Sequence, residues 1–113
     1  MIETKESIEN VDEIAAVDGV DVLLIGSNDL AIEHGVPGKF ESAEFRSALE
    51  AVSHACRKYG KIFGLAGIYV KQELHDWVLN TLGAKFILGQ QDSGLLARSS
   101  KEVVDALSKI HQS

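Results

Sequence analysis

Short apolar segments alternate along the chain with segments that have helical periodicity. Three of them are rich in branched residues and bordered by glycine, which predicts buried strands at Val20–Ile25, Lys61–Ile68 and Lys85–Leu88. Elsewhere, apolar residues recur at the three- and four-residue spacing of one helix face. These helical sets are Ile8, Val11, Ile14 and Ala15; Phe45, Leu49, Val52 and Cys56; Leu74, Val78 and Leu82; and Val103, Val104, Leu107 and Ile110.

The ends of several predicted helices carry residues that favour helix termination or capping. Gly60 and Gly83 each follow a helical run, as glycines in a C-cap position do. Ser99 or Ser100 is the expected N-cap of the last helix. Cys56 shares its predicted apolar face with core residues, so we expect a packed side chain there and not a nucleophile.

The order of elements predicts an α/β fold with parallel strands. If Met1–Glu3 forms a further strand, the chain consists of four strand–helix units. Strands that alternate with helices imply a parallel sheet with right-handed crossovers. Two architectures fit this pattern, a small open sheet or half of a (β/α)8 barrel, and periodicity does not separate them.

Composition narrows the class of protein. The length of 113 residues predicts a single domain, residues 1–113. The net charge of −6 argues against a nucleic-acid or anionic membrane surface, because both ligands require clustered positive charge. No apolar run approaches the roughly 20 residues of a membrane span, and no signal-peptide pattern opens the chain. With a single cysteine as well, we expect a cytoplasmic protein with no membrane partner.

Two carboxylates follow consecutive predicted strands. In both candidate architectures, ligands bind at the carboxyl ends of the strands, where Glu3 and Asp29 stand. Such a pair either holds a hard divalent cation or acts as a general acid/base couple. The alternative is structural: Glu3 is a frayed terminal residue, and Asp29 caps the helix that follows.

Several motifs resemble the HpcH/HpaI aldolase family, the metal-dependent (class II) pyruvate aldolases related to 2-dehydro-3-deoxyglucarate aldolase. The family reads Gly-Pro-x-Asp-Leu where this chain has Gly26-Ser27-Asn28-Asp29-Leu30. The resemblance extends over nearly the whole chain. The other matching segments are Ile2–Glu6, Asn10–Ile14, Gly19–Asp21, Gly35–Gly38, Gly60-Lys61 and Leu95–Arg98.

The resemblance implies an activity and a set of site residues. Family members cleave 4-hydroxy-2-oxo acids reversibly to pyruvate and an aldehyde. Glu3 and Asp29 correspond to the protein ligands of the divalent cation, which would be Mg, Mn or Co. The implied substrate-binding residues are Ser27, Asn28, Asp29, Leu65, Ala66 and Leu88. The backbone N–H groups around Asn28 and Asp29 would bind the pyruvate carboxylate, and Leu65, Ala66 and Leu88 would form an apolar wall.

The resemblance also implies an incomplete site. The family fold is a (β/α)8 barrel of about 250 residues, of which this chain corresponds to the C-terminal half. The family's catalytic arginine and histidine come from earlier strands, so no catalytic residue is assigned here. The alternative function is therefore a catalytically silent half-barrel, or a truncated fragment, that retains metal or oxo-acid binding or an oligomerisation role. Because a half-barrel exposes two sheet edges, we expect the chain to self-associate.

Overall fold

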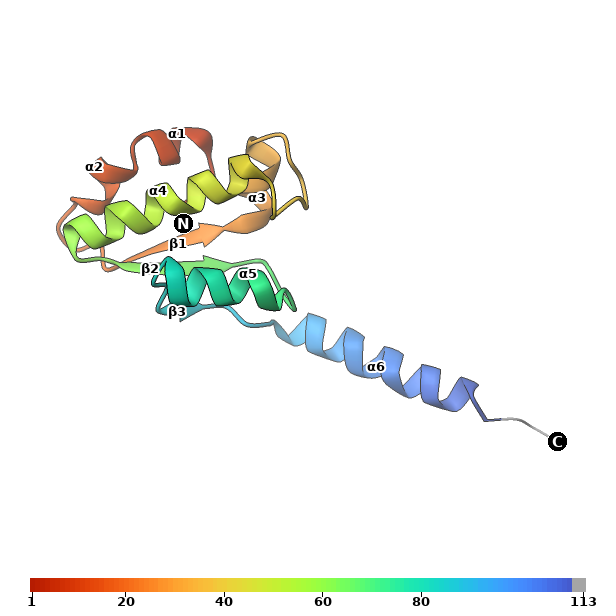
Figure 1. The fold of residues 1–113 in the computed structure, drawn as a ribbon. Helices are drawn as coiled ribbons and strands as arrows, with labels where there is room; N and C mark the ends of the chain where they lie inside the picture. Colours follow the sequence, from red (N-terminus) through yellow and green to blue (C-terminus); the bar gives the residue numbers. More distant parts are fainter. Residues whose placement is uncertain (111–113) are drawn as a thin grey trace.

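Three parallel strands form the central sheet of the computed structural model, which describes residues 1–110 (Figure 1). They are β1 (Val22–Gly26), β2 (Ile62–Ala66) and β3 (Phe86–Ile87), in the order β1-β2-β3. The register pairs Leu24 with Gly64 and Gly64 with Phe86. The α/β class and the parallel pairing agree with the sequence prediction, although the strands are shorter than predicted.

The first predicted strand is present as a single bridge beside β1. Ile2 pairs in parallel with Ile25, and its N–H donates to the Leu24 carbonyl oxygen at 2.7 Å. The Gly26 N–H donates to the Ile2 carbonyl oxygen at 3.0 Å. The Ile2 side chain is buried. The start of the chain is therefore held at the edge of β1.

The helices follow the predicted order, with a further short helix before the second predicted one and with changes to the first and last. They are α1 (Lys5–Glu9), α2 (Val11–Ala15), α3 (Ser27–Glu33), α4 (Ala43–Tyr59), α5 (Gln72–Asp76), the π-helical turn η1 (Trp77–Thr81) and α6 (Asp92–Ser108). The first predicted helix divides at Asn10, whose ψ of 15° leaves the helical region. The last begins at Asp92, so Ser99 and Ser100 lie inside the helix and are not its N-cap. The good helix formers Leu95–Arg98 extend it toward the N-terminus.

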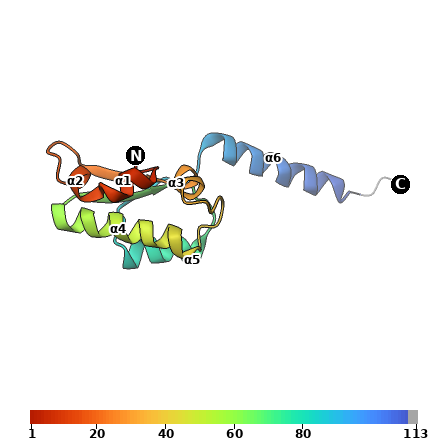
Figure 2. The same ribbon diagram turned by 90° about the horizontal axis from the view of Figure 1, so that it is seen from above.

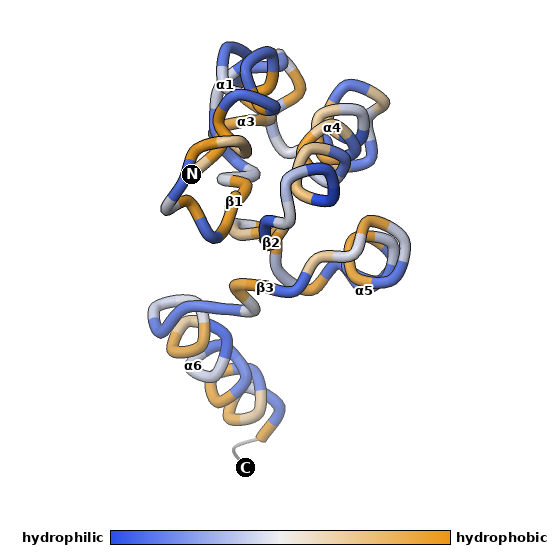
Figure 3. Tube along the Cα trace, turned by 90° about the vertical axis from the view of Figure 1, so that its left-hand side faces the viewer, coloured by the Kyte–Doolittle hydropathy of each residue, from blue (hydrophilic) through white to orange (hydrophobic). Residues whose placement is uncertain are grey.

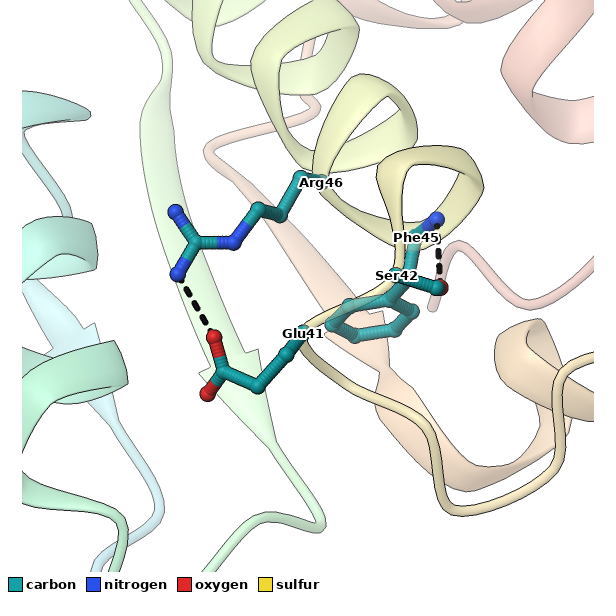
Figure 4. A network of polar contacts seen from close by, with 4 residues as sticks. All are labelled: Glu41, Ser42, Phe45 and Arg46. Atoms are coloured by element: carbon teal, nitrogen blue, oxygen red, sulfur yellow. Dashed lines mark hydrogen bonds and ion pairs between the residues drawn. The ribbon is translucent and has the colours of Figure 1, made fainter.

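Helix α4 has defined caps at both ends. The Phe45 N–H donates to the Ser42 hydroxyl at 3.3 Å, and Arg46 forms an ion pair with Glu41 at 2.6 Å just before the helix (Figure 4). Gly60 follows the last turn with a φ of 68°, in the left-handed region that favours glycine. The predicted C-cap at Gly60 is thus confirmed.

The core lies between the sheet and helices on one of its faces. Figure 3 shows α1, α3, α4 and α5 together on one side of the strands. Alternate strand residues point to that side and are buried there: Leu23, Ile25, Phe63 and Leu65. On the opposite face, a Cβ added to Gly64 would lie 3.0 Å from Leu24 Cδ1, and Phe86 there is exposed.

Helix α6 projects away from the rest of the fold. The long axis of the structure measures 67 Å against 28 and 22 Å for the others, and Figures 1 and 2 show that α6 lies along it. None of the α6 residues, all of which the structure describes, is buried. Among residues 1–110, no helix combines the length and the apolar character that crossing a membrane requires.

The Cys56 thiol lies in the core, as its position in the sequence predicted. It is buried on α4, and this burial raises the pKa of the thiol to about 11. The thiol is therefore protonated at neutral pH, and it lacks the thiolate character that a nucleophile needs.

Ser53→Ala is expected to lower the free energy of unfolding by about 1–3 kcal/mol. The Ser53 hydroxyl, buried on α4, donates to the Leu82 carbonyl oxygen at 2.6 Å, and the substitution leaves that carbonyl without its donor. Urea denaturation measures the loss. Ser47→Ala, at an exposed position of the same helix, is the control. Equal midpoints for the two variants would contradict this role for Ser53.

Candidate functional site

A pocket of about 190 Å³ lies at the carboxyl ends of the strands. It is formed by the ends of the first three parallel segments and by the loops that follow β2 and β3. The residues that line it are Met1, Glu3, Gly26, Ser27, Asn28, Asp29, Ala66, Gly67, Tyr69 and Leu88. Both candidate carboxylates of the sequence analysis are therefore in one pocket.

Glu3 is held against the backbone of Gly26. The bridge formed by Ile2 brings the next residue beside the end of β1. A Cβ added to Gly26 would lie 2.5 Å from Glu3 Oε1 and 2.6 Å from Glu3 Cγ. Only glycine leaves room for the carboxylate in this position. Glu3 is half-buried, and it is not the frayed terminal residue of the structural alternative.

Asp29 lies in the first turn of α3 but does not cap it. The N-cap of this helix is Gly26, and no side-chain hydrogen bond caps the helix. The expectation that Asp29 serves as the N-cap is therefore wrong, because the helix begins three residues earlier than that expectation required. The Asp29 side chain is exposed at the pocket, where its oxygens remain available to a ligand.

Asn28 joins α3 to the loop after β2. Its Nδ2 donates to the Gly67 carbonyl oxygen at 3.1 Å. Gly67 has a φ of 89°, and a Cβ on it would lie 3.0 Å from Asn28 Nδ2. A side chain at Gly67 would thus be strained in its backbone and crowded against Asn28.

The substrate-binding residues expected from the sequence separate into two groups. Ser27, Asn28, Asp29, Ala66 and Leu88 line the pocket. Leu65 belongs to the hydrophobic core on the helix side of β2 and is not among the lining residues, because neighbouring strand residues point to opposite faces.

Two features of the pocket were not anticipated from the sequence. Tyr69 lines it from the loop after β2, one residue beyond the predicted end of that strand. Ser27 is fully buried, and its hydroxyl has no hydrogen-bond partner among residues 1–110. The side chains of Tyr69 and Ser27 both carry a hydroxyl, which adds donors to a pocket whose two charged side chains are carboxylates.

The donor set fits a hard divalent cation held by few protein ligands. No group of three or more His, Cys, Asp or Glu residues suited to a metal occurs in the described part of the chain. Glu3 and Asp29 supply carboxylate oxygens, which Mg²⁺ and similar cations prefer, and such cations keep several positions for water or substrate oxygens. Two carboxylates in an open pocket are compatible with this pattern.

Comparison with known protein families gives one match that spans most of the chain. The model described as HpcH/HpaI aldolase/citrate lyase matches residues 1–97. The solved structure of an HpcH/HpaI aldolase from Desulfitobacterium hafniense superposes with a TM-score of 0.85 at 25% sequence identity. That superposition covers 96% of this chain and 41% of the other.

Curated relatives are similar at the sequence level but considerably longer. A protein from Chaetomium globosum, named 4-hydroxy-4-methyl-2-oxoglutarate aldolase, is 56% identical over 110 residues. One from Hapsidospora irregularis with the same name is 54% identical over 110 residues. Each match covers 97% of this chain and 41% of the relative. The chain thus spans about two-fifths of the length of these relatives.

Proposed function

The chain belongs to the HpcH/HpaI aldolase/citrate lyase family, and from this premise we propose that it supplies the cation-binding and oxo-acid-binding side of an aldolase site. The proposed reaction is the reversible cleavage of 4-hydroxy-2-oxo acids to pyruvate and an aldehyde. The observation that carries the proposal is that Glu3 and Asp29 both line one pocket at the carboxyl ends of parallel strands. The names of the two similar fungal relatives support an oxo-acid substrate.

Glu3 and Asp29 are the proposed ligands of the cation, which is Mg, Mn or Co. When bound, a divalent cation supplies Lewis acidity that stabilises negative charge on an oxo-acid oxygen. Gly26 supports the Glu3 carboxylate through the close contact described above. The fully buried Ser27 precedes Asn28 and Asp29 at the start of α3, so this turn is anchored in the core.

The remaining lining residues orient the oxo acid in this proposal. The backbone N–H groups of Asn28 and Asp29, in the first turn of α3, are available to its carboxylate. Ala66 and Leu88 give the pocket an apolar side, which favours the methyl group of pyruvate and excludes water from it. No residue of this chain is assigned the proton transfers.

Self-association is part of the proposal, and α6 is its main support. Six large apolar side chains on and just after this helix are between 48 and 69% exposed: Leu95, Leu96, Val103, Val104, Leu107 and Ile110. Leu96, Val103 and Leu107 recur at helical spacing and form one stripe. A stripe of this size on a projecting helix favours contact with a second copy of the chain.

Gly26→Ala is expected to weaken Mn²⁺ binding by about 10–100-fold, as the loss of a ligand-supporting contact typically does. The added methyl group would occupy the space of Glu3 Oε1 and force the carboxylate to move. Titration of Mn²⁺ followed by electron paramagnetic resonance measures the affinity. Gly89→Ala is the control, because nothing lies within 4 Å of the added Cβ. Equal affinities for the two variants would count against Glu3 as a ligand.

A second candidate function is a catalytically silent segment that retains metal or oxo-acid binding. This function is favoured because the match covers only 41% of the length of the relative from Chaetomium globosum. The two candidates differ in one result, since both bind the cation but only the first activates pyruvate. The single, buried cysteine supports a reducing compartment such as the cytoplasm for either.

A further inference from the structure

The loop after β2 holds Tyr69 at the pocket through contacts on both sides. The Gly67 carbonyl oxygen accepts the hydrogen bond from Asn28 Nδ2 at 3.1 Å. The Ile68 carbonyl oxygen lies 3.1 Å from His75 Nε2, which donates to it as the Nε2–H tautomer. The Ile68 side chain is buried in the core. Helices α3 and α5 thus fix the two residues that precede Tyr69.

The residue after Tyr69, Val70, has a strained backbone conformation. Val70 has a φ of 58°, which is a rare conformation for a β-branched residue. Its side chain is 80% exposed, so burial of that side chain does not compensate for the strain. Strain of this kind persists only where surrounding contacts impose it, and it is concentrated at functional sites. The result is a sharp bend immediately after Tyr69.

The Tyr69 hydroxyl is a hydrogen-bond donor that the loop after β2 contributes to the pocket. Glu3 and Asp29 accept hydrogen bonds when ionised and donate none. One N–H of the Asn28 amide is already used by Gly67. The hydrogen bonds formed among residues 1–110 include none to the Tyr69 hydroxyl, and the side chain is half-buried. A ligand that extends beyond the carboxylate pair would therefore meet a neutral hydroxyl donor.

We propose that Tyr69 is a specificity-determining residue that donates a hydrogen bond to the distal carboxylate of a 2-oxo dicarboxylate. This inference rests on the proposed function, because it takes the oxo-acid end of the ligand to lie at Glu3 and Asp29. A hydrogen bond from a neutral donor to a charged acceptor is stronger than one between neutral groups. An apolar tail at the same position would gain no hydrogen bond from the hydroxyl. Tyr69 therefore selects dicarboxylates over 2-oxo acids with an alkyl tail.

Two ligands of equal carbon number test this selection. Isothermal titration of the Mn²⁺-loaded chain compares 2-oxoglutarate with 2-oxopentanoate, which has a methyl group in place of the distal carboxylate. We expect Tyr69→Phe to weaken 2-oxoglutarate binding about tenfold and to leave 2-oxopentanoate binding unchanged. The matched control is Tyr59→Phe, which removes the chain's other tyrosine hydroxyl. Tyr59 ends α4 just before β2 begins, so it lies at the opposite edge of the sheet.

Fluorine magnetic resonance provides a second readout, recorded on the wild-type sequence. Because the chain has two tyrosines, incorporation of 3-fluorotyrosine gives two fluorine resonances, which the two phenylalanine variants assign. The Tyr69 resonance is expected to shift on addition of 2-oxoglutarate and to shift less with 2-oxopentanoate. Equal weakening of both ligands by Tyr69→Phe, or no change in either, would overturn the inference and leave the proposed function standing. If neither acid bound the Mn²⁺-loaded wild type, both proposals would fail.

Discussion

Replacing Asp29 by asparagine is expected to reduce the affinity of the chain for Mn²⁺ by about 100-fold or more. Loss of a residue that merely orients a metal ligand costs about 10–100-fold, so loss of a ligand lies at or beyond the upper end of that range. The amide is the same size as the carboxylate but carries no charge. Because Asp29 is exposed and does not cap α3, the substitution leaves the fold intact. Paramagnetic resonance of free Mn²⁺ gives the affinity.

Glu3→Gln provides an independent version of this test, and Asp21→Asn provides its control. Glu3 reaches the pocket from the edge of β1, whereas Asp29 reaches it from α3. Asp21 is exposed and precedes β1, so it lies at the opposite end of the strand. We expect Asp21→Asn to bind Mn²⁺ as the wild type does. Unchanged affinity in both Asp29→Asn and Glu3→Gln would remove the cation from the proposed site.

The second large effect is expected on α6. Leu107→Asp should convert an associated species into a monomer at micromolar concentration, because it puts a charge into the exposed apolar stripe. Light scattering coupled to size-exclusion chromatography gives the mass directly. The fold of the sheet should not change, since no residue of α6 is buried.

Lys101→Asp is the control for this experiment. The substitution changes the net charge of the chain by more than Leu107→Asp does. Lys101, however, lies on the face of α6 opposite the apolar stripe. Its ion pair with Asp105 is exposed, and such pairs contribute little to stability. We expect it to stay associated. A wild-type chain that is strictly monomeric at micromolar concentration would refute self-association outright.

The parallel fold and the position of the pocket follow from features that the sequence carries locally. Glycine-bordered apolar runs predict strands, and the carboxyl ends of parallel strands share one edge. The positions of Glu3 and Asp29 in the sequence are therefore enough to predict that both residues lie at the same edge of the sheet, where they line one pocket. The C-cap at Gly60 is also local, because it depends on the conformational freedom of a single residue.

The features that were not predicted depend on tertiary context. Leu65 follows the apolar pattern of β2, but nearly all of this strand is buried, so its pattern does not say which residue meets a ligand. Tyr69 reaches the pocket because the strained Val70 and the anchors from Asn28 and His75 bend the loop. The break at Asn10 was not predicted either, since the apolar spacing continues across it.

The most direct test of the proposed function is the exchange of pyruvate methyl protons for deuterium, followed by nuclear magnetic resonance with Mg²⁺, Mn²⁺ or Co²⁺ added. This reaction is the enolisation half of the cleavage and requires no aldehyde. Its base is not among the residues assigned here, so a second copy of the chain or the buffer must supply it. We predict exchange that requires the cation and is lost in Glu3→Gln and Asp29→Asn. Absence of exchange in folded chain that binds the cation would contradict the aldolase proposal and identify the pocket as a binding site only.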